Sequence, residues 1–215
     1  STGGRHLDTR LISTASGDGD IFFEEGTIEL NRNNNLFSGT MAVDAGANVH
    51  FTRTIAAGGA QFEFTGGSIT AVGNTTVSGD ILVIDGPEVH DANFVTSSAN
   101  FTLAGIISGV GAVRFTGDGI TTLTGNNSWT GGTTIDGTEV VFSSASNLGT
   151  SDIDLINGHL TFNGSTATIS NLIDLTGVSS IEVGTGDTLT ASNDVSGGGE
   201  LRKLGAGTLV LSGAG

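Results

Sequence analysis

The chain has 215 residues, with 22 acidic and 7 basic side chains, 36 glycines and no cysteine. Its formal net charge of −15 opposes binding to nucleic acid phosphates and anionic lipids, and the lack of cysteine excludes disulfides and thiol chemistry. Glycine without a Gly-X-Y period excludes collagen, and a hydrophobic fraction of 36% is too high for a disordered chain. No run of apolar residues is long enough to span a membrane as a helix.

Short apolar bursts recur along the whole chain, separated by Gly, Asn, Asp, Ser and Thr. In a burst such as Phe62-Glu63-Phe64, alternation places both apolar residues on one face of a strand and the polar residue on the other. No stretch has a helical period, so the chain is expected to be nearly all β. The bursts predict strands, in chain order, at residues 21–23, 28–30, 49–51, 62–64, 81–84, 113–115, 140–142, 160–162, 181–183 and 209–211.

Internal repetition favours a solenoid over a sandwich or a barrel, which would fit the same strand spacing. Residues 107–125 match residues 195–213 without a gap, at a constant offset of 195 − 107 = 88 residues. At roughly 22 residues per turn, this offset predicts about four turns of a β-helix between the copies. A looser copy begins at residues 26–30, which are similar to residues 119–123.

We expect residues 1–215 to form a single domain, a right-handed parallel β-helix (β-solenoid), and to be a fragment of a longer repeat protein because the last copy stops at Gly215. Inward side chains of successive turns would stack in columns, and glycines would form the corners. Asparagines at corners can bond the backbone locally, and stacked asparagines can form amide ladders between turns. Phe37 and Trp129, at matched repeat positions, are expected to fill the core or to cover a corner.

Two motifs carry a resemblance to a known family. Residues 205–213 read Gly-x-Gly-Thr-Leu-x-Leu-x-Gly, and residues 123–135 read Leu-Thr-Gly-Asn-Asn-x-Trp-Thr-Gly-Gly-Thr-Thr-Ile. They resemble the autotransporter-associated β-strand repeat of bacterial autotransporter passenger regions, although Phe115 and Thr116 stand where the repeat usually has Lys-Leu. The resemblance implies a secreted β-helical stalk at the bacterial cell surface, often adhesive. It provides no catalytic residues to transfer.

Parallel β-helices also include pectin-active enzymes, so catalytic candidates need consideration. Asp152 and Asp154 flank Ile153, and His159 follows in a sequence that partly resembles an element of polygalacturonases. The paired aspartates and the Arg-x-Lys element of those enzymes are missing. Carboxylates on one outward face are more often solvated than catalytic, so no catalytic residue is assigned.

Metal sites are considered for two sets of residues. Asp18-Gly19-Asp20 with Glu24 and Glu25 offers oxygen ligands for Ca²⁺, but it lacks both the calcium β-roll series and EF-hand spacing. The histidines lie apart in sequence, at His6, His50, His90 and His159. No metal or cofactor is therefore predicted. Glycosylation triplets begin at Asn74, Asn100, Asn126 and Asn163, and chance explains them in a chain so rich in Asn and Thr.

The sequence predicts an extracellular stalk or adhesin segment of an autotransporter-like surface protein, structural or adhesive and not an enzyme. Expected partners are a surface protein or glycan of a host or neighbouring cell, or further copies of the chain. Neither nucleic acid binding nor membrane insertion by this segment is expected. The alternatives are a self-assembling extracellular filament or matrix subunit and, less favoured, a carbohydrate-active β-helix enzyme.

Overall fold

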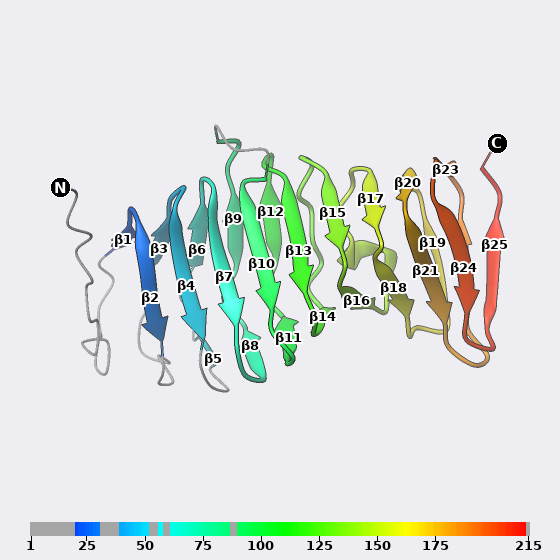
Figure 1. Ribbon diagram of the computed structural model, residues 1–215, viewed down its shortest axis with the longest axis horizontal. Helices are drawn as coiled ribbons and strands as arrows, with labels where there is room; N and C mark the ends of the chain where they lie inside the picture. Colours follow the sequence, from blue (N-terminus) through cyan, green and yellow to red (C-terminus); the bar gives the residue numbers. More distant parts are fainter. Residues whose placement is uncertain (1–19, 31–38, 52–55, 58–60, 87–89, 214–215) are drawn as a thin grey trace.

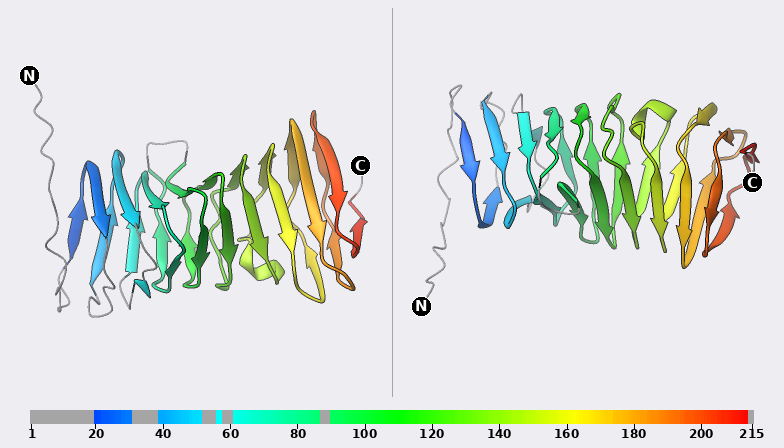
Figure 2. Two further views of the ribbon diagram at one scale, coloured as in Figure 1. Left: turned by 60° about the horizontal axis from the view of Figure 1, so that its bottom comes forward. Right: turned by 90° about the horizontal axis from the view of Figure 1, so that it is seen from above.

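The computed structural model describes residues 20–30, 39–51, 56–57, 61–86 and 90–213. They form a rod of strands wound turn after turn, with β1 at one end and β25 at the other (Figures 1 and 2). All strand pairings are parallel, which confirms the predicted all-β parallel β-solenoid. Within the described ranges the only helix is the short 3-10 helix η1 (Ala145–Asn147), and no helix there is long and apolar enough to cross a membrane.

One side of the rod is a nine-stranded sheet that runs almost its full length. Its strands are β2 (Gly26–Leu30), β4 (Ala47–Phe51), β7 (Gly67–Ala71), β10 (Ala92–Thr96), β13 (Val113–Gly117), β15 (Thr133–Asp136), β17 (Ile153–Ile156), β20 (Ile173–Thr176) and β23 (Val195–Gly197). A second side is an eight-stranded sheet of β5 (Ala56–Ala57), β8 (Thr75–Val77), β11 (Asn100–Leu103), β14 (Ile120–Leu123), β16 (Glu139–Phe142), β18 (His159–Phe162), β21 (Val178–Val183) and β24 (Glu200–Leu204).

The third side is divided between two smaller sheets. The five-stranded sheet contains β1 (Ile21–Phe23), β3 (Thr40–Val43), β6 (Gln61–Phe64), β9 (Ile81–Val83) and β12 (Ile107–Gly109). The three-stranded sheet contains β19 (Thr166–Ile169), β22 (Thr188–Ala191) and β25 (Thr208–Leu211). Segments 126–131 and 143–150 continue this side between the two sheets, because Ser128 N donates to Ile107 O and Thr150 N donates to Trp129 O.

All ten predicted strands are present, and most of them bury alternate side chains as the alternation predicted. Phe62 and Phe64 are buried, and Glu63 between them points outward. β1 alternates as well, but its outward residue is apolar, since Phe22 is 68% exposed whereas Ile21 packs against the core and Phe23 is buried. The strands that the sequence did not indicate are mostly rich in Thr, Ser, Ala or Gly, such as β19 and β22, and so lack a strong apolar signal.

The length of one turn corrects the interpretation of the 88-residue repeat. On the nine-stranded sheet, Val113, Thr133, Ile153, Ile173 and Val195 occupy successive equivalent positions. Four turns therefore take 195 − 113 = 82 residues here, not 88. The other six residues, 113 − 107 = 6, lead from the start of β12 around one corner to the start of β13.

The two sequence copies consequently lie on different sides of the rod. Strands β12, β13 and β14 of the first copy belong to the five-, nine- and eight-stranded sheets. The matching strands β23, β24 and β25 belong to the nine-, eight- and three-stranded sheets. Each strand of the later copy therefore lies one side further around the rod than its counterpart in the earlier copy. The looser N-terminal copy follows the same rule, because β2 lies on the nine-stranded sheet and the matching β14 lies on the eight-stranded sheet. The offset of about four turns is confirmed, and it contains one further side of the rod that the sequence did not indicate.

The core consists of inward columns of apolar side chains, one from each turn. Phe94 lies at the centre of an aromatic group, with ring centroids 5.9 Å from Phe64 and 5.4 Å from Phe115. Further along the rod, Phe142 and Phe162 are paired on the eight-stranded sheet at 5.2 Å. Each such ring contributes about 1.5–3 kcal/mol by leaving water. A continuous core of this kind supplies the stability of a chain that has no disulfides.

Trp129 is fully buried, which confirms that it fills the core, and its indole Nε1 donates to Thr133 Oγ1 at 2.9 Å. Phe37, its repeat counterpart, lies outside the described residues. The asparagines near Trp129 are buried and bond the backbone, which was one of the two possibilities, and they do not form an amide-to-amide ladder. Asn127 Nδ2 donates to the Asn147 carbonyl at 2.6 Å, and Asn147 Nδ2 donates to the Gly125 carbonyl at 2.8 Å. They bind the backbone because a corner leaves main-chain groups that need partners.

Gly149 and Gly137 form a matched pair for testing this packing. Both have positive φ, +67° and +65°, but a Cβ on Gly149 would come within 2.6 Å of the Trp129 ring, and one on Gly137 would meet nothing within 4 Å. We expect Gly137→Ala to cost about 1 kcal/mol from backbone strain alone, and Gly149→Ala to cost about 2–4 kcal/mol because of the clash. Urea unfolding followed by the fluorescence of the single tryptophan measures both. Equal losses of unfolding free energy in the two variants would contradict the packing of Gly149 against Trp129.

Candidate adhesive surface

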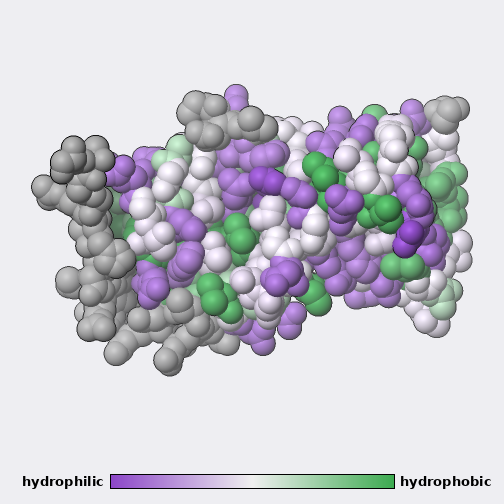
Figure 3. Space-filling view, viewed as in Figure 1, coloured by the Kyte–Doolittle hydropathy of each residue, from purple (hydrophilic) through white to green (hydrophobic). Residues whose placement is uncertain are grey.

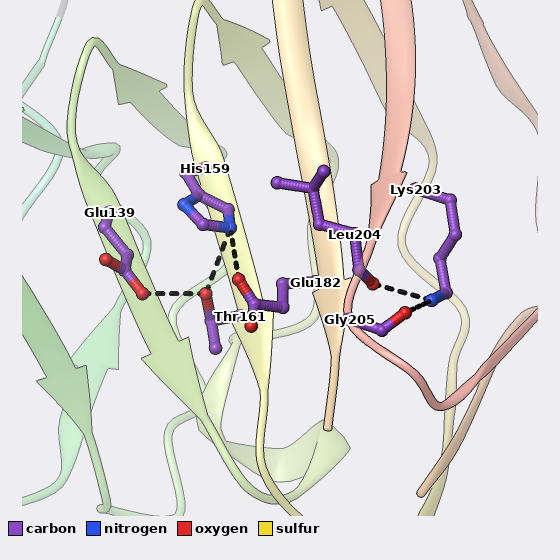
Figure 4. A network of polar contacts seen from close by, with 7 residues as sticks. All are labelled: Glu139, His159, Thr161, Glu182, Lys203, Leu204 and Gly205. Carbon is purple, nitrogen blue, oxygen red and sulfur yellow. Dashed lines mark hydrogen bonds and ion pairs between the residues drawn. The ribbon is translucent and has the colours of Figure 1, made fainter. Parts of the chain in front are cut away.

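The outward side chains of each sheet lie in columns, one residue per turn, and on the eight-stranded sheet they form a polar network (Figure 4). Thr161 Oγ1 donates to Glu139 Oε1 at 2.8 Å, and His159 Nε2 lies 3.3 Å from the same hydroxyl. The His159 ring also lies 3.4 Å from Glu182 Oε2. The network joins three successive turns and remains open to water, because the His159 and Glu182 side chains are 27% and 41% exposed.

Lys203 lies on β24, the last described strand of this sheet (Figure 4). It is paired in register with Ile181, whose side chain is buried, so Lys203 occupies an inward position of the last described turn. Its Nζ donates to the carbonyls of Leu204 and Gly205 at 2.6 and 2.8 Å. The matching residue of the first copy is Phe115, which is buried.

The three residues weighed for catalysis are not brought together. Asp152 and Asp154 lie before and on β17 of the nine-stranded sheet, and His159 begins β18 of the eight-stranded sheet. A corner at Asn157 and Gly158 separates the two sheets. Asp152 and Asp154 are both exposed, and His159 instead contacts Glu182, which is 23 residues away in sequence.

Asp154 lies beside Asp174 of the next turn in an outward column. Partial burial raises the pKa of Asp154, and the charges of Asp174 and Asp152 act in the same direction. Nearby, Arg114 forms an ion pair with Asp136. This part of the nine-stranded sheet therefore holds more negative charge than its cations neutralise.

His90 lies near Arg114, close to this acidic region. Burial lowers the pKa of His90, and the Arg114 guanidinium acts in the same direction. Among the described residues, neither His90 Nδ1 nor Arg114 Nε has a hydrogen-bond partner.

Carboxylates at the corners have a structural role that the sequence reading missed. Asp91, only 2% exposed, accepts the N–H groups of Gly86 and Ala112, both at 2.7 Å. Asp80 accepts Ile106 N at 2.8 Å, one turn further along the rod. The available signal was an Asp directly before an apolar strand, as Asp80 is before β9 and Asp91 before β10.

At an exposed corner Asp118 makes similar contacts, where Ser98 donates its N–H at 2.6 Å and its hydroxyl at 2.8 Å. These two donors lower the pKa of the Asp118 carboxyl. Acidic residues scattered along the sequence are therefore placed in part by the need to satisfy the backbone where the chain turns.

The residues considered for metal binding do not converge in the described part of the chain, where no three His, Asp or Glu side chains form a group suited to a metal ion. Asp20 accepts the N–H of Thr40, and Glu24 and Glu25 are exposed. Asp18 and His6 lie outside the described residues. His50 contacts Asn48 at 3.0 Å on β4, far along the rod from His159.

The face of the rod shown in Figure 3 carries both hydrophobic and hydrophilic residues. On the face shown in Figure 3, hydrophobic residues are separated by hydrophilic ones and form no broad patch along the rod. Apart from Phe22, every described Phe and the single Trp are buried, so the described part of the rod offers almost no aromatic surface for a ligand.

Comparison with known proteins agrees with this architecture. The Adhesin BmaC autotransporter of Brucella suis biovar 1 (strain 1330) is 35% identical to this chain over 168 residues. This chain resembles an autotransporter passenger region. The similarity covers 71% of this chain but only 5% of that adhesin, so the chain corresponds to a small part of it. No protein-family model and no solved structure matches the chain.

The autotransporter resemblance given by the repeat motifs is thus confirmed by an independent similarity and by the β-solenoid. That relative is named both as an adhesin and as an autotransporter.

Asp91 allows a direct test of the corner carboxylates. Asp91→Ala would leave two backbone N–H groups without their acceptor in a buried corner, and we expect it to lower the free energy of unfolding by about 2–3 kcal/mol. Asp118→Ala, at the exposed corner, should cost clearly less because water can replace the carboxylate. Urea denaturation followed by circular dichroism gives both values. A loss for Asp118→Ala as large as that for Asp91→Ala would refute the role assigned to burial.

Replacing Asp154 should stabilise the protein, unlike replacing Asp91, and the gain should depend on pH. Its pKa is raised in the folded protein, so its ionisation opposes folding above that pKa, and the effect disappears below the ordinary value of 3.8. We expect Asp154→Asn to stabilise the protein by about 0.5 kcal/mol at pH 7, and this gain to vanish in acid. Asp136→Asn is the control, since it removes the ion pair with Arg114 and should destabilise at pH 7. Thermal melts of the three proteins between pH 3 and 7 measure these differences.

Proposed function

We propose that this chain is an adhesive stalk segment of an autotransporter-like protein, held at the outside of a bacterial cell, and that it acts by binding rather than by catalysis. The observation that carries the proposal is the outward columns of polar side chains, repeated turn by turn along one continuous rod. A partner molecule that lies along such a rod meets the same kind of contact many times, so weak contacts add up. The similarity to an adhesin supports the same conclusion.

The placement of the repeat copies suggests that different residues serve folding and binding. Because matching copies lie on different sides of the rod, residues at equivalent motif positions face different directions. Arg114 points out from the nine-stranded sheet, and its counterpart Arg202 lies on the eight-stranded sheet. The motif therefore supports folding of the turns, and a binding face along one side must be built largely from residues that the motif does not specify.

The proposal is tested by surface display. The chain, fused to an autotransporter barrel on a non-adherent bacterium, should increase attachment to cultured cells or to a layer of the same bacteria. A core variant, Phe115→Asp, should remove this effect because a buried charge prevents the turns from stacking. Attachment is counted per cell after surface expression is matched by antibody labelling.

Attachment no greater than with the barrel alone, although the displayed rod is folded, would refute the adhesive function. Release of reducing ends from acidic or neutral polysaccharides by the purified chain would refute the absence of catalysis.

A self-assembling filament or matrix subunit is the second candidate function. Sedimentation and electron microscopy separate the two: fibres that grow with concentration favour the filament, and short single rods favour the stalk.

A further inference from the structure

The outward side of the three-stranded sheet carries two neighbouring columns of threonines. Thr166 of β19, Thr188 of β22 and Thr208 of β25 are in register, one per turn. Thr168 and Thr190 form a second column beside them, which Val210 continues. We call the outward surface formed by these five threonines the threonine face. Neighbouring turns are about 4.8 Å apart, and the two columns are separated by about two residues of strand, roughly 6.6 Å.

The hydroxyls of the threonine face are free for a ligand. Thr166, Thr168 and Thr208 are exposed, and Thr188 and Thr190 are partly exposed, whereas Ala167 and Leu189 between them pack inward. Within the described residues, none of these five hydroxyls forms a hydrogen bond with another protein group. Each therefore offers one donor, an acceptor and a methyl group to whatever lies on the sheet.

The threonine face is also uncharged, in a chain whose net charge is −15. Strands β19, β22 and β25 contain no charged residue, and neither do segments 126–131 and 143–150, which precede them on the same side. The other long sides differ, with Glu139 and Glu182 on the eight-stranded sheet and Asp154 and Asp174 on the nine-stranded sheet. An ionic partner would gain nothing from the threonine face, whereas a neutral one avoids the repulsion found elsewhere.

We propose that the threonine face binds an uncharged polysaccharide that lies along the axis of the rod, an inference that rests on the proposed adhesive function. The spacing of the turns is close to the rise of one hexose in an extended β-linked chain. Two successive sugars would each meet a pair of threonines, and a third would meet Thr208 and Val210. Sugar hydroxyls and Thr hydroxyls satisfy each other as donors and acceptors, and the Thr methyl groups pack against the C–H surface of the ring. Without aromatic stacking, the affinity per turn is low and grows with the number of turns.

The experiment uses the purified chain and four insoluble neutral polysaccharides, namely cellulose, chitin, mannan and curdlan, with carboxymethyl cellulose beads as the charged comparison. We expect retention on at least one neutral polymer and weaker retention on the charged beads. The triple variant Thr166→Val, Thr188→Val and Thr208→Val keeps shape and β propensity but removes three hydroxyls, and it should weaken retention about tenfold or more. Thr→Ser at the same positions should restore part of the binding.

The control variant carries Thr76→Val, Thr102→Val and Thr122→Val. These threonines form a single outward column on the eight-stranded sheet, interrupted by Val141. The control should bind like the unmodified chain. Retention of the threonine-face variant at the unmodified level, equal loss in the control variant, or no retention on any neutral polymer would overturn the proposal.

The same variants in the display assay separate this inference from the proposed function. If the unmodified chain promotes attachment and the threonine-face variant does so equally well, the adhesive function stands and the threonine face is not its site. If the unmodified chain promotes no attachment, the adhesive function itself fails. Loss of rod-to-rod association in the Val variant, without loss of polysaccharide retention, would assign the face to a second copy of the chain and would also overturn the proposal.

Discussion

Hydrogen bonding between successive turns is the constraint on which the rest of this structure depends. Each strand pairs in parallel and in register with the strand one turn away, so every residue has a fixed neighbour about 4.8 Å along the axis. A side chain that points inward on one turn therefore requires an inward side chain above and below it. The columns that contain Phe94 and Phe115, or Phe142 and Phe162, follow directly from this requirement. The outward columns follow from it too, and they provide the repeated surface on which an adhesive function would depend.

The corners are where this arrangement is most demanding, because the regular ladder stops there and its N–H and C=O groups lose their partners. Short polar side chains supply hydrogen-bond partners for these corner groups. Asp91 and Asp80 accept N–H groups, and Asn127 and Asn147 bind carbonyls of the adjacent turn. Much of the acidic and amide content of the sequence is thus part of the fold. Such residues resemble metal or catalytic candidates in a sequence, although most of their oxygens are already engaged.

The 88-residue repeat and the turn of the solenoid are not in phase, and this separates folding from recognition. Trp129 and the glycine-rich motif around it specify a corner and a core, and the strands of matching copies lie on different sides of the rod. The threonine face arises on one side only, where β19, β22 and β25 place two neighbouring outward columns in which five of the six residues are threonines. Two of these strands lie outside the recognisable copies. A long array of such repeats can therefore keep one folding code while it varies the surface that it presents.

The sequence by itself determined the fold class, the strands with strong apolar alternation such as β6, the burial of Trp129 and the resemblance to autotransporter passengers. These features depend on local periodicity or on repeated motifs, which can be read along the chain. The tertiary structure alone decided which residues meet. His159 lies five residues from Asp154 yet on another side of the rod, and it contacts Glu182 of the next turn. The reason is that turns vary between 19 and 26 residues, as from Phe62 to Ile81 and from Ile81 to Ile107, so no fixed period places a residue on a side.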